Sequence, residues 1–186
     1  MAPRPLIIDT DPGKDDAVAI LLALAAPDIF DIRLMSAAAG NVELSHTAGN
    51  IIRLCEVAGR GEIPVHAGCP RPLLQALKTV PHIHGEDGLG GASLPPPGRP
   101  PSEIHAVPAI IEAIRTSREA VSIACIGPLT NLGLALVMAP DIVERIGEIV
   151  VMGGSFTTGN ITPHASFNIY SDPHAARIVF GCGAPV

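Results

Sequence analysis

The chain has 186 residues, of which 47% are hydrophobic and 16% are charged, and its formal net charge is −6. This size and apolar content suit one well-cored domain and favour an α/β protein whose central strands are apolar on both faces. The negative charge, without a basic stripe, argues against nucleic-acid binding. The longest apolar run is too short to span a bilayer and the N-terminus lacks a secretory apolar region, so we expect an intracellular, cytoplasmic protein.

Strand-like and helix-like patterns alternate along the chain. Runs typical of buried strands cover residues 6–8, 32–37, 64–67, 121–126 and 149–152. Runs typical of helices cover residues 15–26, 44–58, 103–117, 129–138 and 173–180. This alternation predicts a mostly parallel, Rossmann-like open sheet with helices on both faces, joined by right-handed crossovers. We expect one domain over residues 1–186, with the sheet cut short at the C-terminus.

Residues 68–101 break this alternation. They are rich in proline, glycine and histidine, and they end in the sequence LPPPGRPP. A long irregular segment inside a compact domain is usually a functional loop or lid. A mobile surface insertion remains an equal alternative for its proline-rich part. The four cysteines are too far apart in sequence for a zinc or redox pair, so we expect ordinary core thiols.

An acidic turn follows the first strand. Four carboxylates fall within eight residues, at Asp9, Asp11, Asp15 and Asp16. Pro12-Gly13 predicts a turn between the strand and the first helix, which places the acids at the carboxyl end of a strand, where ligand crevices lie. Crowded carboxylates repel each other unless protons or a hard cation such as Ca²⁺ or Mg²⁺ compensate.

Two alternatives to a cation or sugar site stay open at this turn. Asp15 and Asp16 can simply cap the first helix, although capping leaves Asp9 and Asp11 unexplained. Some phosphatases also carry two spaced acids after a strand, but their fifth position is Thr or Val, whereas this chain has Gly13.

Polar residues also follow the later strands. Asn41 follows the second strand, and the sequence HIHGEDG, with His82 and His84, lies in the irregular segment. These histidines can bind metal, move protons or lie in a solvated loop. In GPLTN, after the fourth strand, Thr130 or Asn131 can cap the next helix. The loop after the fifth strand holds hydroxyls and amides that suit polyol recognition, among them Asn160, Ser166 and Asn168.

At this point the sequence resembles the inosine–uridine-preferring nucleoside hydrolases. The run DTDPGKDDA is similar to the signature of that family, and HIHGEDG, GPLTN, VMGG and GN–FNIYSDP match it in the same order. The resemblance implies hydrolysis of the N-glycosidic bond of ribonucleosides to ribose and free base. It also implies a homo-oligomer without nucleic-acid or membrane partners.

The resemblance implies a Ca²⁺ site and a general base. Asp11 resembles the general base, which also touches Ca²⁺ and takes a proton from a bound water. Asp16 resembles the bidentate Ca²⁺ ligand, and Thr130 resembles the position that gives a backbone carbonyl to the ion. Asp9 resembles a supporting residue of the turn.

The resemblance also implies the substrate contacts. Asp15 resembles the acid that binds the ribose 2′-hydroxyl, and His84 resembles the histidine beside the base. The ribose-contacting positions are Asn41, Met152, Asn160 and Asn168. The family often has Glu where this chain has Ser166, which would replace a ribose-contacting carboxylate by a hydroxyl.

Family members are longer than this chain, and their C-terminal part carries a further His-Asp pair. We therefore expect an N-terminal portion of the fold, with a Ca²⁺ site one carboxylate short. The alternative is a non-catalytic remnant or nucleoside- or sugar-binding protein of the same fold.

Overall fold

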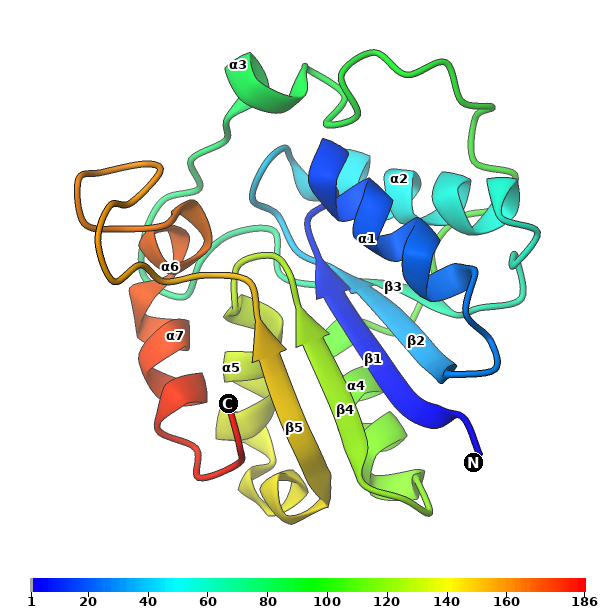
Figure 1. Cartoon of the computed structure of the whole chain (residues 1–186), viewed down its shortest axis with the longest axis vertical. Coiled ribbons are helices and arrows are strands. Elements are labelled where there is room, and N and C mark those ends of the chain that lie inside the picture. The colour runs from blue at the N-terminus through cyan, green and yellow to red at the C-terminus, as the bar shows by residue number, and fades with distance from the viewer. Residues whose placement is uncertain (1) are drawn as a thin grey trace.

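The computed structural model describes residues 2–186 (Figure 1). Within this range five parallel strands form one sheet in the order β3-β2-β1-β4-β5. The strands are β1 (Arg4–Thr10), β2 (Phe30–Ala37), β3 (Val65–Ala67), β4 (Val121–Cys125) and β5 (Ile146–Val151). The predicted α/β class with a parallel sheet is confirmed.

Helices alternate with these strands. They are α1 (Lys14–Leu24), α2 (Leu44–Val57), α3 (Pro81–His84), α4 (Ala106–Thr116), α5 (Thr130–Met138), the 3₁₀ helix η1 (Pro140–Arg145), α6 (Phe167–Ser171) and α7 (Pro173–Phe180). The five predicted helices are present, but α4 begins three residues later than predicted because the ring of His105 accepts a hydrogen bond from the amide of Val107 at its N-terminus. The short helices α3, α6 and η1 were not predicted.

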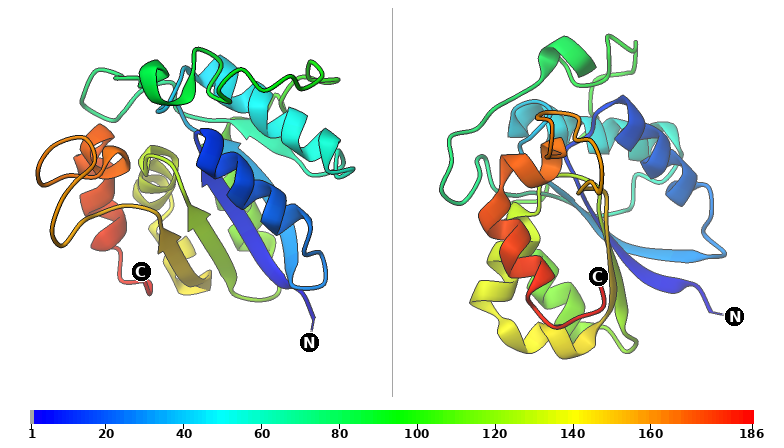
Figure 2. Two further views of the ribbon diagram at one scale, coloured as in Figure 1. Left: turned by 45° about the horizontal axis from the view of Figure 1, so that its top comes forward. Right: turned by 60° about the vertical axis from the view of Figure 1, so that its left-hand side comes forward.

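The two faces of the sheet have separate cores. Ile7 of β1 packs into a cluster with Ile110 of α4 and Leu132 of α5. Its neighbours Leu6 and Ile8 point to the other face and pack with residues of α1 and α2. Figure 2 shows these two helical layers on either side of the strands. Burying each such side chain contributes about 1.5–3 kcal/mol, which holds the strand ends in fixed relative positions.

The side of β4 and β5 nearest α1 is more open than the side covered by α4, α5 and α7. Ile123 and Ile149 are buried, whereas Val150 is 55% exposed. The end of the chain runs along the outer edge of β5, where the amide of Ile149 donates to the carbonyl of Pro185 at 2.8 Å.

Three of the four thiols, Cys55, Cys69 and Cys125, are buried, and Cys182 is partly exposed. Across residues 2–186, no helix combines the length and the apolar character needed to cross a bilayer.

Candidate functional site

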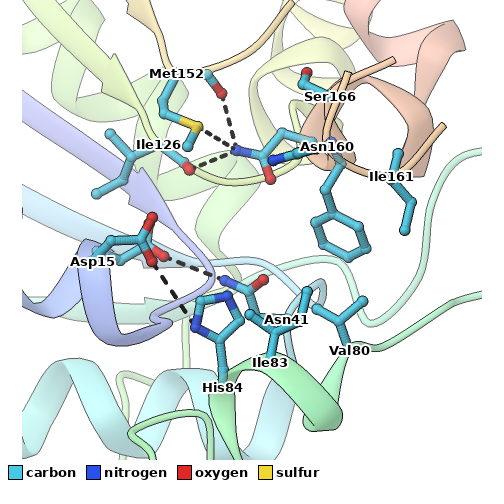
Figure 3. A pocket seen from close by; sticks show the side chains of 13 residues that line it. Asp15, Asn41, Val80, Ile83, His84, Ile126, Met152, Asn160, Ile161 and Ser166 are labelled. Carbon is cyan, nitrogen blue, oxygen red and sulfur yellow. Dashed lines mark hydrogen bonds and ion pairs between the residues drawn. The ribbon is translucent and has the colours of Figure 1, made fainter. Parts of the chain in front are cut away.

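A pocket of about 350 Å³ lies at the carboxyl ends of the central strands. Eight of the residues predicted for the site line it: Asp15, Asp16, Asn41, His84, Met152, Asn160, Ser166 and Asn168. Figure 3 shows Asp15, Asn41 and His84 on one side and Met152, Asn160 and Ser166 on the other. Parallel strands end at one edge of the sheet, so residues distant in sequence meet there.

The acidic turn forms the first side of the pocket. β1 ends at Thr10, and the chain turns at Pro12-Gly13 into α1. The carboxylate of Asp16 accepts a hydrogen bond from the amide of Gly13 at 2.9 Å and from the hydroxyl of Thr10 at 3.2 Å. Asp16 therefore closes the first turn of α1, as the capping alternative predicts, and its charge lies at the positive end of the helix.

Asp11 lies beneath the pocket lining and is fully buried. Its Oδ2 accepts a hydrogen bond from the amide of Asn41 at 2.7 Å, while its Oδ1 has no hydrogen-bond partner. The side-chain amide of Asn41 donates to the Asp11 carbonyl at 3.0 Å and to Asp16 Oδ2 at 3.3 Å. Burial, and then the charge of Asp16, raise the pKa of Asp11 well above its usual value, and burial raises the pKa of Asp16 to about 6.

Two glycines allow neighbouring turns to lie directly on Asp11. A Cβ at Gly40 would collide with the Asp11 carboxylate, and a Cβ at Gly127 would lie 2.5 Å from Asp11 Oδ1. Thr130, which follows Gly127, is also buried, and its hydroxyl donates to Asp172 at 2.8 Å. The structure thus places Asp11 and Thr130 behind the surface of the pocket rather than in its lining.

Asp9 is held by a separate buried network. Its Oδ1 accepts hydrogen bonds from Ser36 and, at 2.8 Å, from the side chain of Asn131, while its Oδ2 has no partner. Burial raises the pKa of Asp9 to about 6. The prediction that Thr130 or Asn131 caps α5 was wrong, because both side chains bind acids from other elements and Leu129 occupies the cap position without a side-chain hydrogen bond.

The second side of the pocket carries amides and a hydroxyl. The Asn168 amide nitrogen donates to the carbonyl of Ile126 at 2.8 Å and to that of Met152 at 2.9 Å. Asn160 Oδ1 accepts from the amide of Phe167 at 2.7 Å, and Ser166 Oγ accepts from the amide of Gly154 at 2.7 Å. These bonds join the ends of β4 and β5 to α6 and leave Asn168 Oδ1 and Asn160 Nδ2 for a ligand.

His84 lies where α3 meets the acidic turn. Its Nδ1 accepts a hydrogen bond from the amide of Lys14 at 3.2 Å and lies 3.9 Å from Asp15 Oδ1. Burial lowers the pKa of His84, so the neutral ring is favoured near neutral pH. With Nδ1 accepting, the ring proton lies on Nε2.

Apolar side chains complete the lining, and the sequence patterns did not single them out. They are Val80, Ile83, Ile126, Ile161 and Phe167. Ile83 lies inside the HIHG motif, and Phe167 precedes Asn168 within FNIYSDP. For these two residues, the position inside a motif is the signal that could have found them, since an apolar residue is otherwise assigned to the core.

The donor set fits a hard cation in part. Two buried carboxylates, Asp11 and Asp16, share one turn, and Asp11 Oδ1 has no hydrogen-bond partner in the protein. Burial, together with the charge of Asp16 on Asp11, raises the pKa values of these acids, and a cation bound there would offset both causes. Across residues 2–186, however, three or more Asp, Glu, His or Cys side chains are nowhere grouped so as to hold a metal ion. These two carboxylates would therefore be only part of a cation's ligand set.

Comparison with known proteins identifies the family. The model of the inosine-uridine preferring nucleoside hydrolases matches residues 6–186. This chain belongs to that family. It is 44% identical over 182 residues to the pyrimidine-specific ribonucleoside hydrolase RihA of Citrobacter koseri, covering 98% of this chain and 58% of RihA. It is also 49% identical over 183 residues to an uncharacterized protein of Schizosaccharomyces pombe, covering 97% of this chain and 59% of that protein.

Solved structures of the family have the same fold. A purine-preferring ribonucleoside hydrolase from Gardnerella vaginalis superposes with a TM-score of 0.94 at 32% identity, covering 98% of this chain and 59% of that one. The plant nucleoside hydrolase PpNRh1 gives a TM-score of 0.91 at 38% identity, covering 98% and 58%. The chain thus spans less than three fifths of the length of these nucleoside hydrolases.

Proposed function

We propose that this protein hydrolyses the N-glycosidic bond of ribonucleosides, releasing ribose and the free base. The observation that carries the proposal is the arrangement of the pocket. Acids of one turn and His84 lie on one side, and amides from the loop after β5 and from α6 lie on the other. The names of the relatives support ribonucleosides as the substrate class, since one is pyrimidine-specific and another purine-preferring.

The polar groups of the pocket suit a ribose between its two sides. Asp15 is 64% exposed at the side chain and can accept a hydrogen bond from a sugar hydroxyl. On the other side, Asn168 Oδ1 offers an acceptor and Asn160 Nδ2 offers a donor. The second polar atom of each amide, Asn168 Nδ2 and Asn160 Oδ1, is already bonded to the backbone. Together these groups would orient the sugar by hydrogen bonds from both sides.

Asp11 is proposed as the general base. Its Oδ1 has no hydrogen-bond partner in the protein, so it can accept the proton of the water that attacks the anomeric carbon of the ribose. As the glycosidic bond breaks, positive charge develops on the ribose, and the nearby carboxylates stabilise it. His84 would donate a hydrogen bond from Nε2 to the departing base.

The resemblance to the family adds a Ca²⁺ ion to this proposal. Asp11, Asp16 and the backbone carbonyl of Thr130 would hold it, which fits the unpartnered oxygen of Asp11. A bound Ca²⁺ would supply positive charge that offsets the repulsion between the acids and favours ionisation of water.

The test is release of free ribose from uridine and inosine, measured with a chelator, without it, and after Ca²⁺ is restored. Release that stops on chelation and returns with Ca²⁺ supports the hydrolase. Nucleoside binding without release, measured by calorimetry on the same samples, would contradict it and favour a binding protein of the same fold. Phosphate release from phosphomonoesters, in place of ribose release, would also overturn it.

A further inference from the structure

His84 is held by a helix that has little packing of its own. α3 contains four residues, Pro81–His84, and none of them is buried. Beyond the helix, the amide of Gly90 donates to the His84 carbonyl at 2.7 Å. On the other side of the helix, buried Val80 donates from its amide to the Asn41 carbonyl at 3.0 Å. The position of the His84 ring therefore depends on this anchor and on how the following loop, residues 85–91, lies against the rest of the protein.

This loop lies directly on the acidic turn. Gly88 has a φ of +84°, and a Cβ there would lie 2.9 Å from the carbonyl oxygen of Pro12 and 3.1 Å from Asn50 Nδ2. Leu89 is buried, and a Cβ at Gly90 would lie 2.9 Å from the Lys14 side chain. Such close backbone contact with residues 12–14 restricts the conformation of the loop and of the adjoining His84.

One buried side chain of α2 joins that helix to the loop. Asn50 is 2% exposed, and its Nδ2 donates to the carbonyl of Asp87 at 2.7 Å. Its Oδ1 accepts from Arg53 at 3.2 Å, which fixes the orientation of the amide. The carboxylate of Asp87 closes the loop by accepting from the amides of Leu89 at 3.0 Å and Gly91 at 3.2 Å.

The packing of this loop determines which atom His84 contacts. Its Nδ1 meets the amide of Lys14, one of the N–H groups at the start of α1 that lack a partner within the helix. An imidazole nitrogen can accept this bond only when it carries no proton. If the loop shifts, the ring loses this partner, and the proton is then free to move between the two nitrogens.

We propose that Asn50 is a positioning residue for His84: by holding the Asp87 carbonyl, it keeps His84 Nδ1 on the Lys14 amide and the ring proton on Nε2. The catalytic part of this statement rests on the proposed nucleoside hydrolysis. The structural part, the tautomer of His84, does not.

The test replaces Asn50→Asp in the full chain and reads the His84 tautomer from ¹H–¹⁵N spectra of the imidazole at pH 8, assigned with His84→Gln. The Asp side chain has the same size but lacks the donor and places a charge against the Asp87 carbonyl. We expect the wild-type protein to show the Nε2–H form and the variant to show a mixture of the two tautomers. The control is Gly49→Ala on the same helix, where a Cβ meets nothing within 4 Å, and its His84 signals should match those of the wild type.

A second variant covers the case in which Asn50→Asp does not fold. Asp87→Ala removes the two hydrogen bonds that close the loop but leaves α2 intact, and it should shift the His84 tautomer in the same direction. Wild-type His84 signals in folded Asn50→Asp or in Asp87→Ala would overturn the proposal.

Turnover gives a separate readout. If the chain releases ribose, Asn50→Asp should lower kcat about 10–100-fold with KM little changed, because a misplaced histidine weakens the transition state more than sugar binding. If the wild-type chain releases no ribose, the proposed hydrolysis fails, while the tautomer measurement still decides whether Asn50 positions His84.

Discussion

The two sides of the pocket hold their polar groups in opposite ways. On the acidic side, two carboxylate oxygens, Asp11 Oδ1 and Asp9 Oδ2, are buried without a hydrogen-bond partner. On the amide side, Asn168 Nδ2 and Asn160 Oδ1 are bonded to the backbone, and no buried polar atom of either side chain lacks a partner. The first side is therefore destabilised until protons or a cation arrive, whereas the second has no such unsatisfied buried atom in these two residues.

Because of this difference, exchanges between an acid and its amide should change stability in opposite directions on the two sides. Exchanging an acid for its amide should stabilise the cation-free fold on the first side, since it removes a buried charge. Exchanging the buried amide of Asn168 for its acid should destabilise the fold on the second side, since it adds a buried charge. The predictions below test this contrast.

The largest effect is expected for Asp11→Asn. We expect turnover to fall about 10²–10⁴-fold, the usual contribution of a general base, and Ca²⁺ affinity to fall with the lost charge. The free energy of unfolding in chelator should rise, because the variant lacks the charge that burial and Asp16 disfavour. Ribose release, calcium titration and urea unfolding measure the three quantities. Unchanged turnover in the folded variant would remove Asp11 from the proposed mechanism.

A large loss of stability is expected for Asn168→Asp. Asn168 is 6% exposed, and its nitrogen donates to the carbonyls of Ile126 and Met152. A carboxylate would face two carbonyl oxygens without a donor, so we expect a loss of about 3–5 kcal/mol in the free energy of unfolding at pH 7. Urea unfolding measures it, and the loss should shrink at low pH, where the protonated acid can donate one hydrogen bond.

The matched control for this variant is Asn160→Asp on the same side of the pocket. Asn160 is exposed and uses its oxygen to accept from the amide of Phe167, a role that a carboxylate keeps. Its stability should stay close to that of the wild type. An equal loss in both variants would show that the amide side is sensitive to charge in general, and the argument from the Asn168 donor would fail.

The fold could be predicted from sequence because its elements carry local patterns. Strand cores such as Leu6-Ile7-Ile8 and the apolar face of α2 can be recognised from the hydrophobic pattern of a few residues. The short helices α3 and α6 could not be predicted this way. α3 buries no residue, and α6 has five residues, too few to show a helical period.

The site could be predicted only in its location, from the rule that ligands bind at the carboxyl ends of parallel strands. That rule, with the family motifs, placed Asp15, Asn41 and Asn168 at one edge of the sheet, where the structure also has them. It could not say what each side chain binds. Asn131 was expected to cap its own helix but reaches Asp9, 122 positions earlier in the chain. Such partners depend on tertiary packing that a local pattern does not contain.

The smallest expected effect concerns Asp9 and the pH dependence of stability. Burial raises the pKa of Asp9 from 3.8 to about 6 in the folded protein. Below pH 3.8 both the folded and the unfolded chain keep the proton, so the stabilisation by this group is fully present there. As the pH rises to about 6 the unfolded chain loses its proton first, and this stabilisation is lost, at most about 3 kcal/mol.

Asp9→Asn removes this titration, so its free energy of unfolding relative to the wild type should rise between pH 4 and pH 7, measured by urea unfolding in chelator. Asp141→Asn is the opposite control. Asp141 is exposed and its pKa is lowered by its hydrogen bond to Arg115. The free energy of unfolding of that variant, relative to the wild type, should therefore fall slightly as the pH rises to about 4 and change little above it. A flat difference for Asp9→Asn would mean that Asp9 keeps an ordinary pKa in the folded protein. The unsatisfied charge of the acidic side would then be confined to Asp11 and Asp16, next to the pocket.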